Sequence, residues 1–478
     1  MTTSNVLIWA AAGIGILVRI LAYLMNRAVW YDEAMLALNI IRRSTSGLWA
    51  PLDYQQAAPV GFLMNEKLSV HMFGDSEYAL RLLPFFFGIL SLIVFTVLAK
   101  ELLQGYPAAI AVLVFALSPY LVNYAAEAKQ YESDVFGAVT VLLLGWWVMR
   151  NESRLLPLTA WALFGAVWIW FSHPVVFILA GTWIQVIIFA VGRENRRLAV
   201  RAFVVECIWL ISFGLSYLRL LKPLTTNAYL LDYWKNGFPT QQLPLWPFHA
   251  LLWAFDNPGS FQLSWLSASP LALLLLLTGI VAMWKRHRTL YWSMTTPFLF
   301  VLFAATAQKY PFQGRLILFL VPLMILMIGF GLEEIGRLRI GLRIPLAAVS
   351  AAALAFPVVG IVKVVRPSQR LSAGIRPAIQ YVASHRGLAG VTIYGEDHSI
   401  EYYSYRNKLT VLQKSIAAPY SDAPATDNGG RWYIFVDVAP EAVASLVAKL
   451  NRQGVIAERL SFGAIQVLRY IPSLSRTA

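Results

Sequence analysis

Two acidic clusters contain the side chains of this sequence that are best suited to chemistry. The first, Trp30-Tyr31-Asp32-Glu33, follows an N-terminal apolar run and leads into the amphipathic stretch AMLALNIIRR. A carboxylate at the mouth of a membrane cavity can act as a general base that removes a proton from an acceptor hydroxyl. Because adjacent residues of a helix diverge by about 100°, we expect only one of Asp32 and Glu33 to point into a site. The alternative is an aromatic belt followed by an interfacial helix with an acidic N-terminus.

The second cluster is NYAAEAKQYESD, between two apolar runs. If this segment is helical, four of its residues share one stripe, at spacings of four, four and three: Asn123, Glu127, Tyr131 and Asp134. Such a stripe aligns two carboxylates and a phenol. A solvated or inter-helix face is equally compatible with the pattern, because loops at helix ends are commonly charged. In a third interpretation, Lys129 and Tyr131 bind an anion.

Four further side chains are candidates for binding a phosphate or another polar group of a substrate. Lys67 precedes the second apolar run, and Lys309 and Arg315 lie in QKYPFQGR between two later runs. Arginine can hold a phosphate through two parallel hydrogen bonds, whereas lysine acts as a point charge. Snorkelling to lipid headgroups is the alternative for each. His173, in FSHPVV, is a candidate ligand or proton shuttle, with a helix-end hydrogen-bond donor as the ordinary alternative.

The composition places these residues in a membrane protein. Of 478 residues, 58% are hydrophobic and 13% are charged, and the mean hydropathy is +0.60, which excludes a large soluble enzyme with a charged surface. The net charge of +14 comes mostly from Lys and Arg in short gaps between apolar runs, so it indicates topology rather than nucleic-acid binding. Cys207 is the one cysteine and lies in an apolar run, which gives no basis for disulfide, metal or redox chemistry.

Eleven apolar runs are long enough to cross a bilayer core of about 30 Å. They lie near residues 6–26, 82–102, 106–122, 134–149, 156–171, 174–191, 201–221, 264–284, 290–306, 315–333 and 343–364. Three basic links, 193–201, 285–288 and 337–343, fall on one side of the resulting topology. By the positive-inside rule this side is cytoplasmic, as is the N-terminus. The outer face then receives two long loops, 27–81 and 222–263, and the C-terminal tail.

We therefore predict a polytopic α-helical membrane domain over 1–365, which includes those outer loops, and a small extracytoplasmic α/β domain over 366–478. Strand-like segments of the tail, GVTIYG, RWYIFVDV and AIQVLRYI, alternate with helical stretches. The best-marked helix, APEAVASLVAKLNRQG, has Pro440 at its start and Gly454 as its expected C-terminal cap. No catalytic constellation is evident in the tail, which we expect to help position an acceptor or a partner.

The motifs that would accompany a nucleotide-dependent site are absent from the sequence. There is no Walker A motif, no GxGxxG in a strand–turn–helix context, no HExxH and no sizeable cytoplasmic domain. If the carboxylates and cations meet on the outer face, the activated donor must already be there. A lipid-linked phosphate is the natural carrier.

Three segments resemble bacterial membrane glycosyltransferases of the GT-C fold, near the protein O-mannosyltransferases and the aminoarabinose transferases: WYDEAMLALNI, QAAPVGFLMNEKLSVHMFGDSEYALRLLP and SPYLVNYAAEAKQYESDVF. The similarity covers approximately the first 200 residues, and later only the helix count and QKYPFQGRLILFLVP. The resemblance implies an enzyme of the bacterial inner membrane. It would move a hexose- or pentose-type sugar from polyprenyl phosphate to a glycan, lipid or protein acceptor on the outer face, typically with inversion.

Residue types and the resemblance together give the candidate site. The catalytic candidates are Asp32, Glu33, Glu127 and Asp134; the donor-phosphate candidates are Arg315, Lys309, Lys129 and Lys67; the substrate-binding candidates are Tyr131 and His173. The resemblance implies that Asp32 removes the acceptor proton, and Arg315 is our first choice to stabilise the departing phosphate. A divalent cation bridging Asp32 to Glu127 or Asp134 is compatible with this fold, and carboxylates that orient sugar hydroxyls are the alternative.

Two other functions fit a chain of this kind. A transporter or lipid flippase would also have many spans with polar groups near cavities. The two halves show no convincing duplication and the acids concentrate on one face, which favours the transferase. A non-enzymatic assembly factor, with the tail as its interaction module, would explain the acidic clusters poorly.

Overall fold

The computed structural model describes residues 3–239, 270–337, 372–387, 389–414 and 430–473. The chain forms two units. The first, the membrane unit, comprises residues 1–25, 43–72 and 78–366, and the second comprises 26–42, 73–77 and 367–478. Two parts of the first predicted outer loop therefore belong with the C-terminal tail. The segment with Asp32 and Glu33 is one of them.

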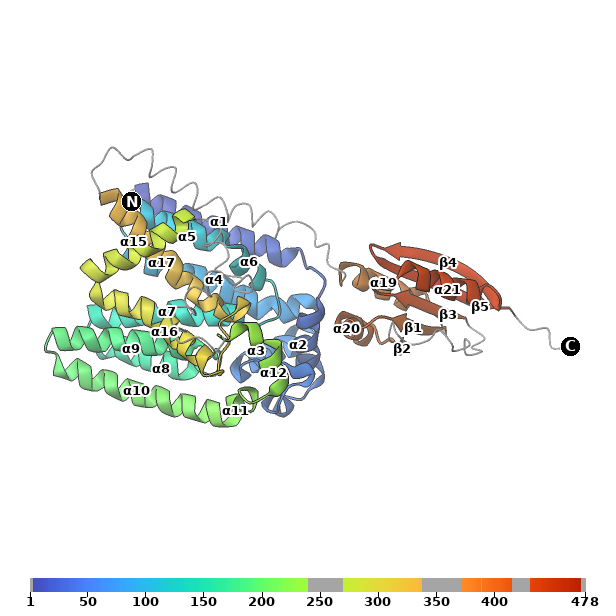
Figure 1. Ribbon diagram of the computed structural model, residues 1–478, viewed down its shortest axis with the longest axis horizontal. Helices are drawn as coiled ribbons and strands as arrows, with labels where there is room; N and C mark the ends of the chain where they lie inside the picture. Colours follow the sequence, from blue (N-terminus) through green and yellow to red (C-terminus); the bar gives the residue numbers. More distant parts are fainter. Residues whose placement is uncertain (1–2, 240–269, 338–371, 388, 415–429, 474–478) are drawn as a thin grey trace. The chain divides into compact units, whose positions relative to one another are not determined.

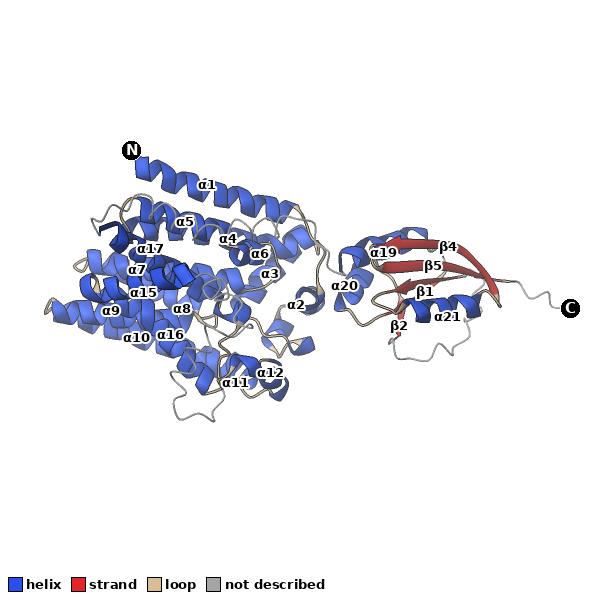
Figure 2. Ribbon diagram, turned by 45° about the horizontal axis from the view of Figure 1, so that its top comes forward, coloured by secondary structure: helices blue, strands red, loops and turns tan. Residues whose placement is uncertain are grey.

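The membrane unit is helical (Figures 1 and 2). Its described α-helices are α1 (Thr3–Leu24), α3 (Val60–Phe73), α4 (Glu77–Leu102), α5 (Tyr106–Leu117), α6 (Pro119–Tyr124), α7 (Tyr131–Arg150), α8 (Leu155–Trp168), α9 (Val175–Gly192), α10 (Arg196–Ser216), α11 (Lys222–Leu224), α12 (Ala228–Tyr233), α15 (Pro270–Arg286), α16 (Arg288–Thr306) and α17 (Val321–Arg337). Short 3-10 helices lie at η1 (Ser46–Trp49), η2 (Asp53–Gln55), η4 (Lys235–Gly237) and η5 (Gly314–Leu320), and a π-helical turn lies at η3 (Tyr217–Leu221).

Seven helical segments of the described chain are long and apolar enough to cross a membrane: Thr3–Leu24, Glu77–Leu102, Tyr131–Arg150, Val175–Gly192, Arg196–Leu224, Arg288–Thr306 and Gly314–Arg337. Two apolar helices, α5 and α8, are shorter. The described part of each predicted span from 6–26 to 315–333 is mostly helical, with a break in 106–122, whereas 343–364 lies outside the described residues. The chain is thus a multi-pass membrane protein.

The predicted span 106–122 is not one helix. α5 ends at Leu117, Ser118 takes ψ 117°, and α6 starts at Pro119. Proline cannot donate a backbone hydrogen bond, and it disfavours helical geometry in the residue before it. The helical stripe considered for residues 123–134 is also wrong, because turns separate α6 from α7.

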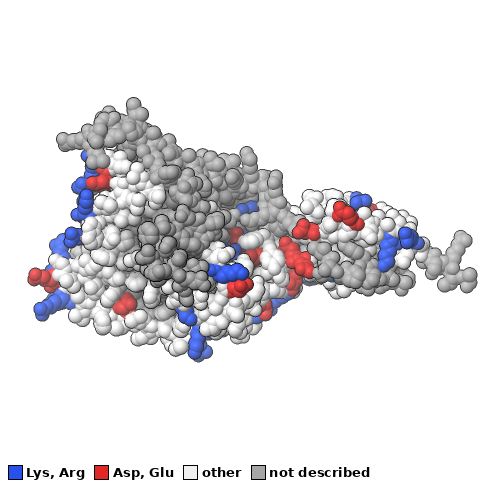
Figure 3. All heavy atoms as spheres, in the orientation of Figure 1, with Lys and Arg blue, Asp and Glu red and all other residues white. Residues whose placement is uncertain are grey.

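Polar contacts join the helix ends that carry the basic links. Arg150 at the end of α7 pairs with Glu101 of α4, and Arg286 of α15 pairs with Glu334 of α17 at 3.0 Å. The link between α9 and α10 joins the one between α7 and α8, through a 2.9 Å bond from Asn195 to a carboxyl oxygen. The described basic links therefore lie at one end of the membrane unit, as predicted, and Figure 3 shows blue side chains there.

The second unit contains a five-stranded sheet with the order β2-β1-β3-β5-β4. Its strands are β1 (Gly390–Tyr394), β2 (Val411–Lys414), β3 (Arg431–Phe435), β4 (Gly454–Phe462) and β5 (Ile465–Pro472). Strand β1 pairs in parallel with β2 and β3, whereas β5 pairs antiparallel with β3 and β4. The described helices of this unit are α2 (Tyr31–Arg42), α19 (Ser372–His385), α20 (His398–Arg406) and α21 (Pro440–Leu450).

The structure confirms three predicted strands and corrects two local predictions. Pro440 starts α21, but Gly454 is the first residue of β4 rather than a helix cap. A Cβ at Gly454 would lie 2.3 Å from the Ile471 carbonyl oxygen, so close strand pairing explains this glycine. The acidic first turn of α2 suits the positive end of the helix dipole. Residues 33–40 are all buried, which contradicts an amphipathic interfacial helix.

Glycines let α15 and α17 of the membrane unit touch through their backbones. A Cβ added at Gly279 would lie 1.8 Å from the Met327 carbonyl oxygen, and one at Gly331 would lie 2.0 Å from that of Leu275. Small residues at such crossings allow close van der Waals packing, which drives helix association in lipid.

We predict that Gly279→Ala lowers the free energy of unfolding by about 3 kcal/mol, because the added methyl group meets backbone that cannot rotate away. Gly13→Ala is the matched control, since a Cβ there has no neighbour within 4 Å and alanine favours the helix. Reversible unfolding in detergent measures both variants. Equal stability of the two would contradict the close crossing.

Candidate functional site

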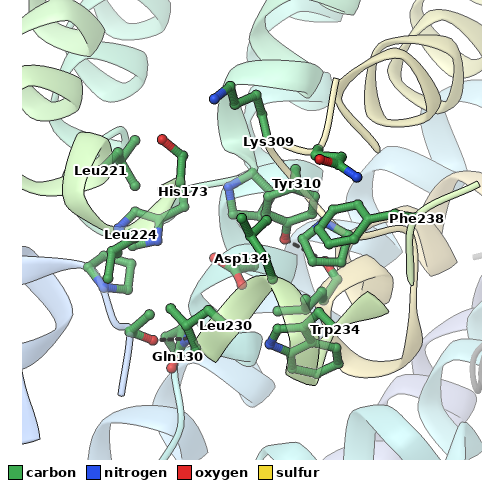
Figure 4. Close-up of a pocket in the computed structure, with 18 of the residues that line it drawn as sticks. Gln130, Asp134, His173, Leu221, Leu224, Leu230, Trp234, Phe238, Lys309 and Tyr310 are labelled. Atoms are coloured by element: carbon green, nitrogen blue, oxygen red, sulfur yellow. Dashed lines mark hydrogen bonds between the residues drawn. The ribbon is translucent and has the colours of Figure 1, made fainter. Parts of the chain in front are cut away.

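A cavity of ≈140 Å³ lies in the membrane unit. Its lining comes from segments far apart in the sequence, namely 57–59, 130–134, 173–174, 221–238 and 308–316. These include the starts of α7 and α9, at the end opposite the basic links. Figure 4 shows Asp134 between His173 and Tyr310, with Lys309 nearby.

Asp134 lies in the first turn of α7 and is 4% exposed. Two hydrogen bonds join this turn to the end of α8. The Trp168 indole donates to the Ser133 carbonyl at 2.9 Å, and the Ser133 hydroxyl donates to the Phe171 carbonyl at 3.1 Å. The Ser172 side chain lies beside the Asp134 carboxyl group. These contacts hold the carboxyl group in place, as is needed to orient a substrate hydroxyl.

Tyr310 supplies a phenol beside this carboxyl group. Burial, followed by the negative charge of Asp134, raises the pKa of Tyr310 well above its usual range. Its hydroxyl donates to the Leu316 carbonyl at 2.7 Å, which ties the link after α16 to η5. The phenol therefore remains protonated at neutral pH and can act as a hydrogen-bond donor but not as a base.

His173 lies in the link between α8 and α9, directly on the cavity. Burial lowers its pKa to about 4, because the charged imidazolium is poorly solvated there. The ring is therefore neutral at pH 7. It can donate or accept one hydrogen bond to a substrate, but it adds no positive charge to the cavity.

Two of the predicted cations lie at or beside the cavity. Lys309 lines it. Arg315 is not among the described lining residues, but its guanidinium carbon lies 5.5 Å from the ring centre of Tyr131 and 5.7 Å from that of Trp234, and both rings line the cavity. Cation–π contacts at these distances help to hold the arginine in place. The role of the two cations with a phosphate stays a prediction.

Glu127 and Lys129 are buried in the turns before α7, each 3% exposed, and are not among the described cavity-lining residues. The Asn123 amide donates to Glu127 at 3.3 Å, and the Lys129 ammonium donates to the Gln56 side chain at 2.8 Å. Both residues therefore attach these turns to other segments. Lys67 lies on α3, where burial lowers its pKa, and is likewise outside the described lining.

Asp32 and Glu33 belong to the second unit. They lie in the first turn of α2, where Glu33 is 1% exposed and Asp32 is partly exposed. Among described residues, no three His, Cys, Asp or Glu side chains gather as a metal site. A cation bridging Asp32 to Glu127 or Asp134 would join residues of both units and stays a prediction.

The sequence analysis missed two buried ionisable side chains close to Asp134. Arg19 of α1 and Glu132 of α7 are both 0% exposed, and their charges act on each other. Arg19 also donates to the Ala116 carbonyl at 3.0 Å. A signal was present, because an arginine inside an apolar run is costly unless it has a partner. Tyr310 and Trp234 of the cavity were missed as well, since aromatic residues are common throughout this sequence.

Comparison with known proteins identifies the fold. No family model matches the sequence, and no curated protein matches it. ArnT from Cupriavidus metallidurans in the apo state matches with a TM-score of 0.54 and 15% identity, over 98% of each chain. The same protein bound to undecaprenyl phosphate matches with 0.54 and 14%, over 99% of each chain.

The Archaeoglobus fulgidus oligosaccharyltransferase, in complex with Zn and sulfate, matches with a TM-score of 0.51 and 12% identity. This match covers 86% of the present chain and 62% of the other. At these identities the likeness shows the fold, which is the GT-C fold shared by both neighbours. The fold predicted from the sequence is thus confirmed.

We predict that acid destabilises the protein partly through His173. Its folded-state pKa of about 4 lies below the unfolded value of 6.5, so the unfolded chain takes up the proton first as the pH falls. Stability is then lost between pH 6.5 and 4, by about 3 kcal/mol for this ring.

Unfolding measured at pH 7 and at pH 4.5 tests this expectation. His173→Asn should lose less stability on acidification than the wild type, because asparagine does not titrate. His71→Asn, at an exposed position on α3, should follow the wild type. If His173→Asn lost as much stability between pH 7 and pH 4.5 as the wild type, this would contradict the assignment of the acid destabilisation to His173.

Proposed function

We propose that this protein is a membrane glycosyltransferase that moves a sugar from a polyprenyl-phosphate donor to an acceptor on the extracytoplasmic face. The observation that carries the proposal is a cavity lined by Lys309 and a fixed carboxyl group, Asp134, with Arg315 beside two of its aromatic rings, within a GT-C fold. Two cations beside a carboxylate suit a phosphate-linked sugar, whose phosphate needs positive charge and whose hydroxyls need acceptors. One neighbour of the same fold is bound to undecaprenyl phosphate.

The positions of the basic residues indicate on which side of the membrane the cavity lies. The described basic links gather at one end of the membrane unit, and the cavity lies at the other. By the positive-inside rule the basic end and the N-terminus are cytoplasmic. The cavity and the C-terminal domain are then extracytoplasmic, where an activated sugar must arrive already linked to lipid.

The cavity's volume restricts which part of the donor enters it. Sites for drug-sized ligands are about 300–1,000 Å³, and a water molecule takes about 30 Å³ of liquid. A cavity of ≈140 Å³ therefore admits a phosphate or part of a sugar.

The proposed reaction is a single displacement at the anomeric carbon. The acceptor oxygen forms a bond to that carbon while its proton passes to the Asp32 carboxylate. The bond from the anomeric carbon to the phosphate oxygen breaks, and the electron pair leaves with the lipid phosphate, so the configuration inverts. Arg315 and Lys309 stabilise the charge on the leaving oxygen.

The other candidates support this step without bond changes of their own. Asp134 and Glu33 accept hydrogen bonds from sugar or acceptor hydroxyls, whereas Tyr131 and His173 contact the sugar. Glu127 and Lys129 hold the turns that lead to Asp134, and Lys67 adds positive charge to the outer loop. A divalent cation held by carboxylates would supply further stabilisation of the phosphate charge.

We predict that Asp32→Asn abolishes transfer but leaves donor binding intact, because the amide keeps the shape and loses the base. Loss of a general base costs about 10²- to 10⁴-fold in rate. The measurement is transfer of labelled sugar from a polyprenyl-phosphate donor in lipid, over a panel of acceptors. Asp53→Asn is the matched control in the same outer loop, where Asp53 is exposed and pairs with Arg43 at 2.8 Å.

If Asp32→Asn transfers sugar at the wild-type rate, Asp32 is not the base, and Glu127 and Asp134 become the candidates. Movement of the donor across the bilayer, without transfer to any acceptor, would instead establish a flippase or transporter.

We predict that Arg315→Gln weakens binding of undecaprenyl phosphate by about tenfold, which corresponds to about 1.4 kcal/mol. Arg288→Gln is the control, because Arg288 makes a comparable contact with Trp284, at 5.2 Å, at the basic end of the membrane unit. Titration of both variants with undecaprenyl phosphate in detergent measures the difference. Equal dissociation constants would exclude Arg315 from the phosphate site.

A further inference from the structure

Within the second unit, helix α20 contacts the first-loop helix α2 near both of its ends. Before α2, the Val29 amide donates to the Tyr403 hydroxyl of α20 at 2.8 Å. At its start, the rings of Tyr31 and His398 lie 4.9 Å apart. At its end, Arg42 pairs with a carboxylate of α20 and lies 4.8 Å from the Tyr405 ring centre. These contacts flank the turn that carries Asp32 and Glu33.

A buried carboxylate adds a second attachment. The Glu77 side chain is 6% exposed and receives Arg406 of α20 at 2.5 Å and Arg376 of α19 at 3.5 Å. Arg406 also lies 3.5 Å from Asp75, and Arg376 donates to the Asn26 carbonyl at 2.8 Å. A buried charge is costly unless it is paired, so losing either arginine should loosen the attachment.

Both attachments involve α20, which lies after the carboxyl end of a parallel strand, where α/β domains usually bind ligands. Helix α20 follows the carboxyl end of strand β1, whose neighbours in the sheet are β2 on one side and β3 on the other. Open α/β sheets bind small molecules outside such carboxyl ends. In this domain, α20 binds segments of the chain's own first loop.

From these contacts we infer that the C-terminal domain is the positioning element for α2. Tyr403 contacts the chain just before α2, and Arg406 acts on the same segment through Glu77 and Arg376, so both residues influence where Asp32 is held. This inference rests on the proposed function, in which Asp32 is the base. It differs from the role expected from the sequence, in which the tail positions an acceptor or partner. The acceptor's proton can only be removed if the base is held at a fixed place.

The test uses the full-length protein in lipid and the variant Arg406→Gln. Hydrogen exchange of residues 26–42 should become at least about tenfold faster, because the attachment opens more often. The rate constant for transfer should fall by about tenfold, with the affinity for undecaprenyl phosphate unchanged. Arg406→Lys, which keeps the charge, should restore most of the rate.

Two further variants make the result specific. Tyr403→Phe removes only the hydroxyl that accepts from Val29, so it should give a smaller effect of the same kind without threatening the fold. Arg469→Gln breaks an ion pair with Glu458 at 3.0 Å on the sheet, and serves as the control for general destabilisation of the domain.

Exchange and transfer rates in Arg406→Gln that match those of Arg469→Gln would overturn the inference. An effect on donor affinity alone would overturn it too, since a positioning role acts on the rate constant. If the wild type transfers no sugar to any acceptor, the proposed function fails, and the exchange rates still decide whether the domain holds α2.

Discussion

A helix that ends inside a membrane unit leaves carbonyl oxygens without donors, and the candidate site depends on how this chain meets that constraint. Pro119 ends α5 early, and Arg19 donates to the Ala116 carbonyl near the break at 3.0 Å. Glu132 of α7 is equally buried and interacts electrostatically with Arg19. The break and this interaction therefore lie beside the start of α7, where Asp134 lies.

The electrostatics of the cavity follow from this arrangement. Tyr310 remains protonated and His173 neutral, and positive charge is brought by Lys309, which lines the cavity, and by Arg315, which lies beside two of its rings. The Asp134 carboxyl group adds oxygens that can bind a hydroxyl. Such a site attracts an anion and still offers an acceptor for a hydroxyl, which is the combination that a sugar phosphate requires.

The sequence was sufficient for features that depend on local pattern. Apolar runs located the helices, and alternating residues located three strands of the tail, because burial in lipid or in a sheet imposes those periods. The predicted span 106–122 continued past Pro119, because a hydropathy pattern does not show that proline lacks a backbone amide donor. Arg19 was overlooked because its partners, Ala116 and Glu132, are about a hundred residues away.

The assignment of α2 to the second unit was the feature that was hardest to predict from the sequence. It depends on contacts such as Val29 with Tyr403, 374 residues apart, and no local pattern encodes a pairing of that kind. Three of the candidate residues, Tyr131, Asp134 and His173, line the cavity, and the sequence marked them because they occur at helix ends beside apolar runs, where polar groups are costly. Their roles stay predictions.

The candidate residues of the proposed reaction are divided between the two units. The proposed donor is a lipid, and the cations proposed for its phosphate, Lys309 and Arg315, belong to the membrane unit. The proposed base, Asp32, lies on α2 within the second unit, where contacts with the C-terminal domain flank it. Contacts that fix α2 within the second unit then matter for the rate as much as those that fix Asp134 within the first.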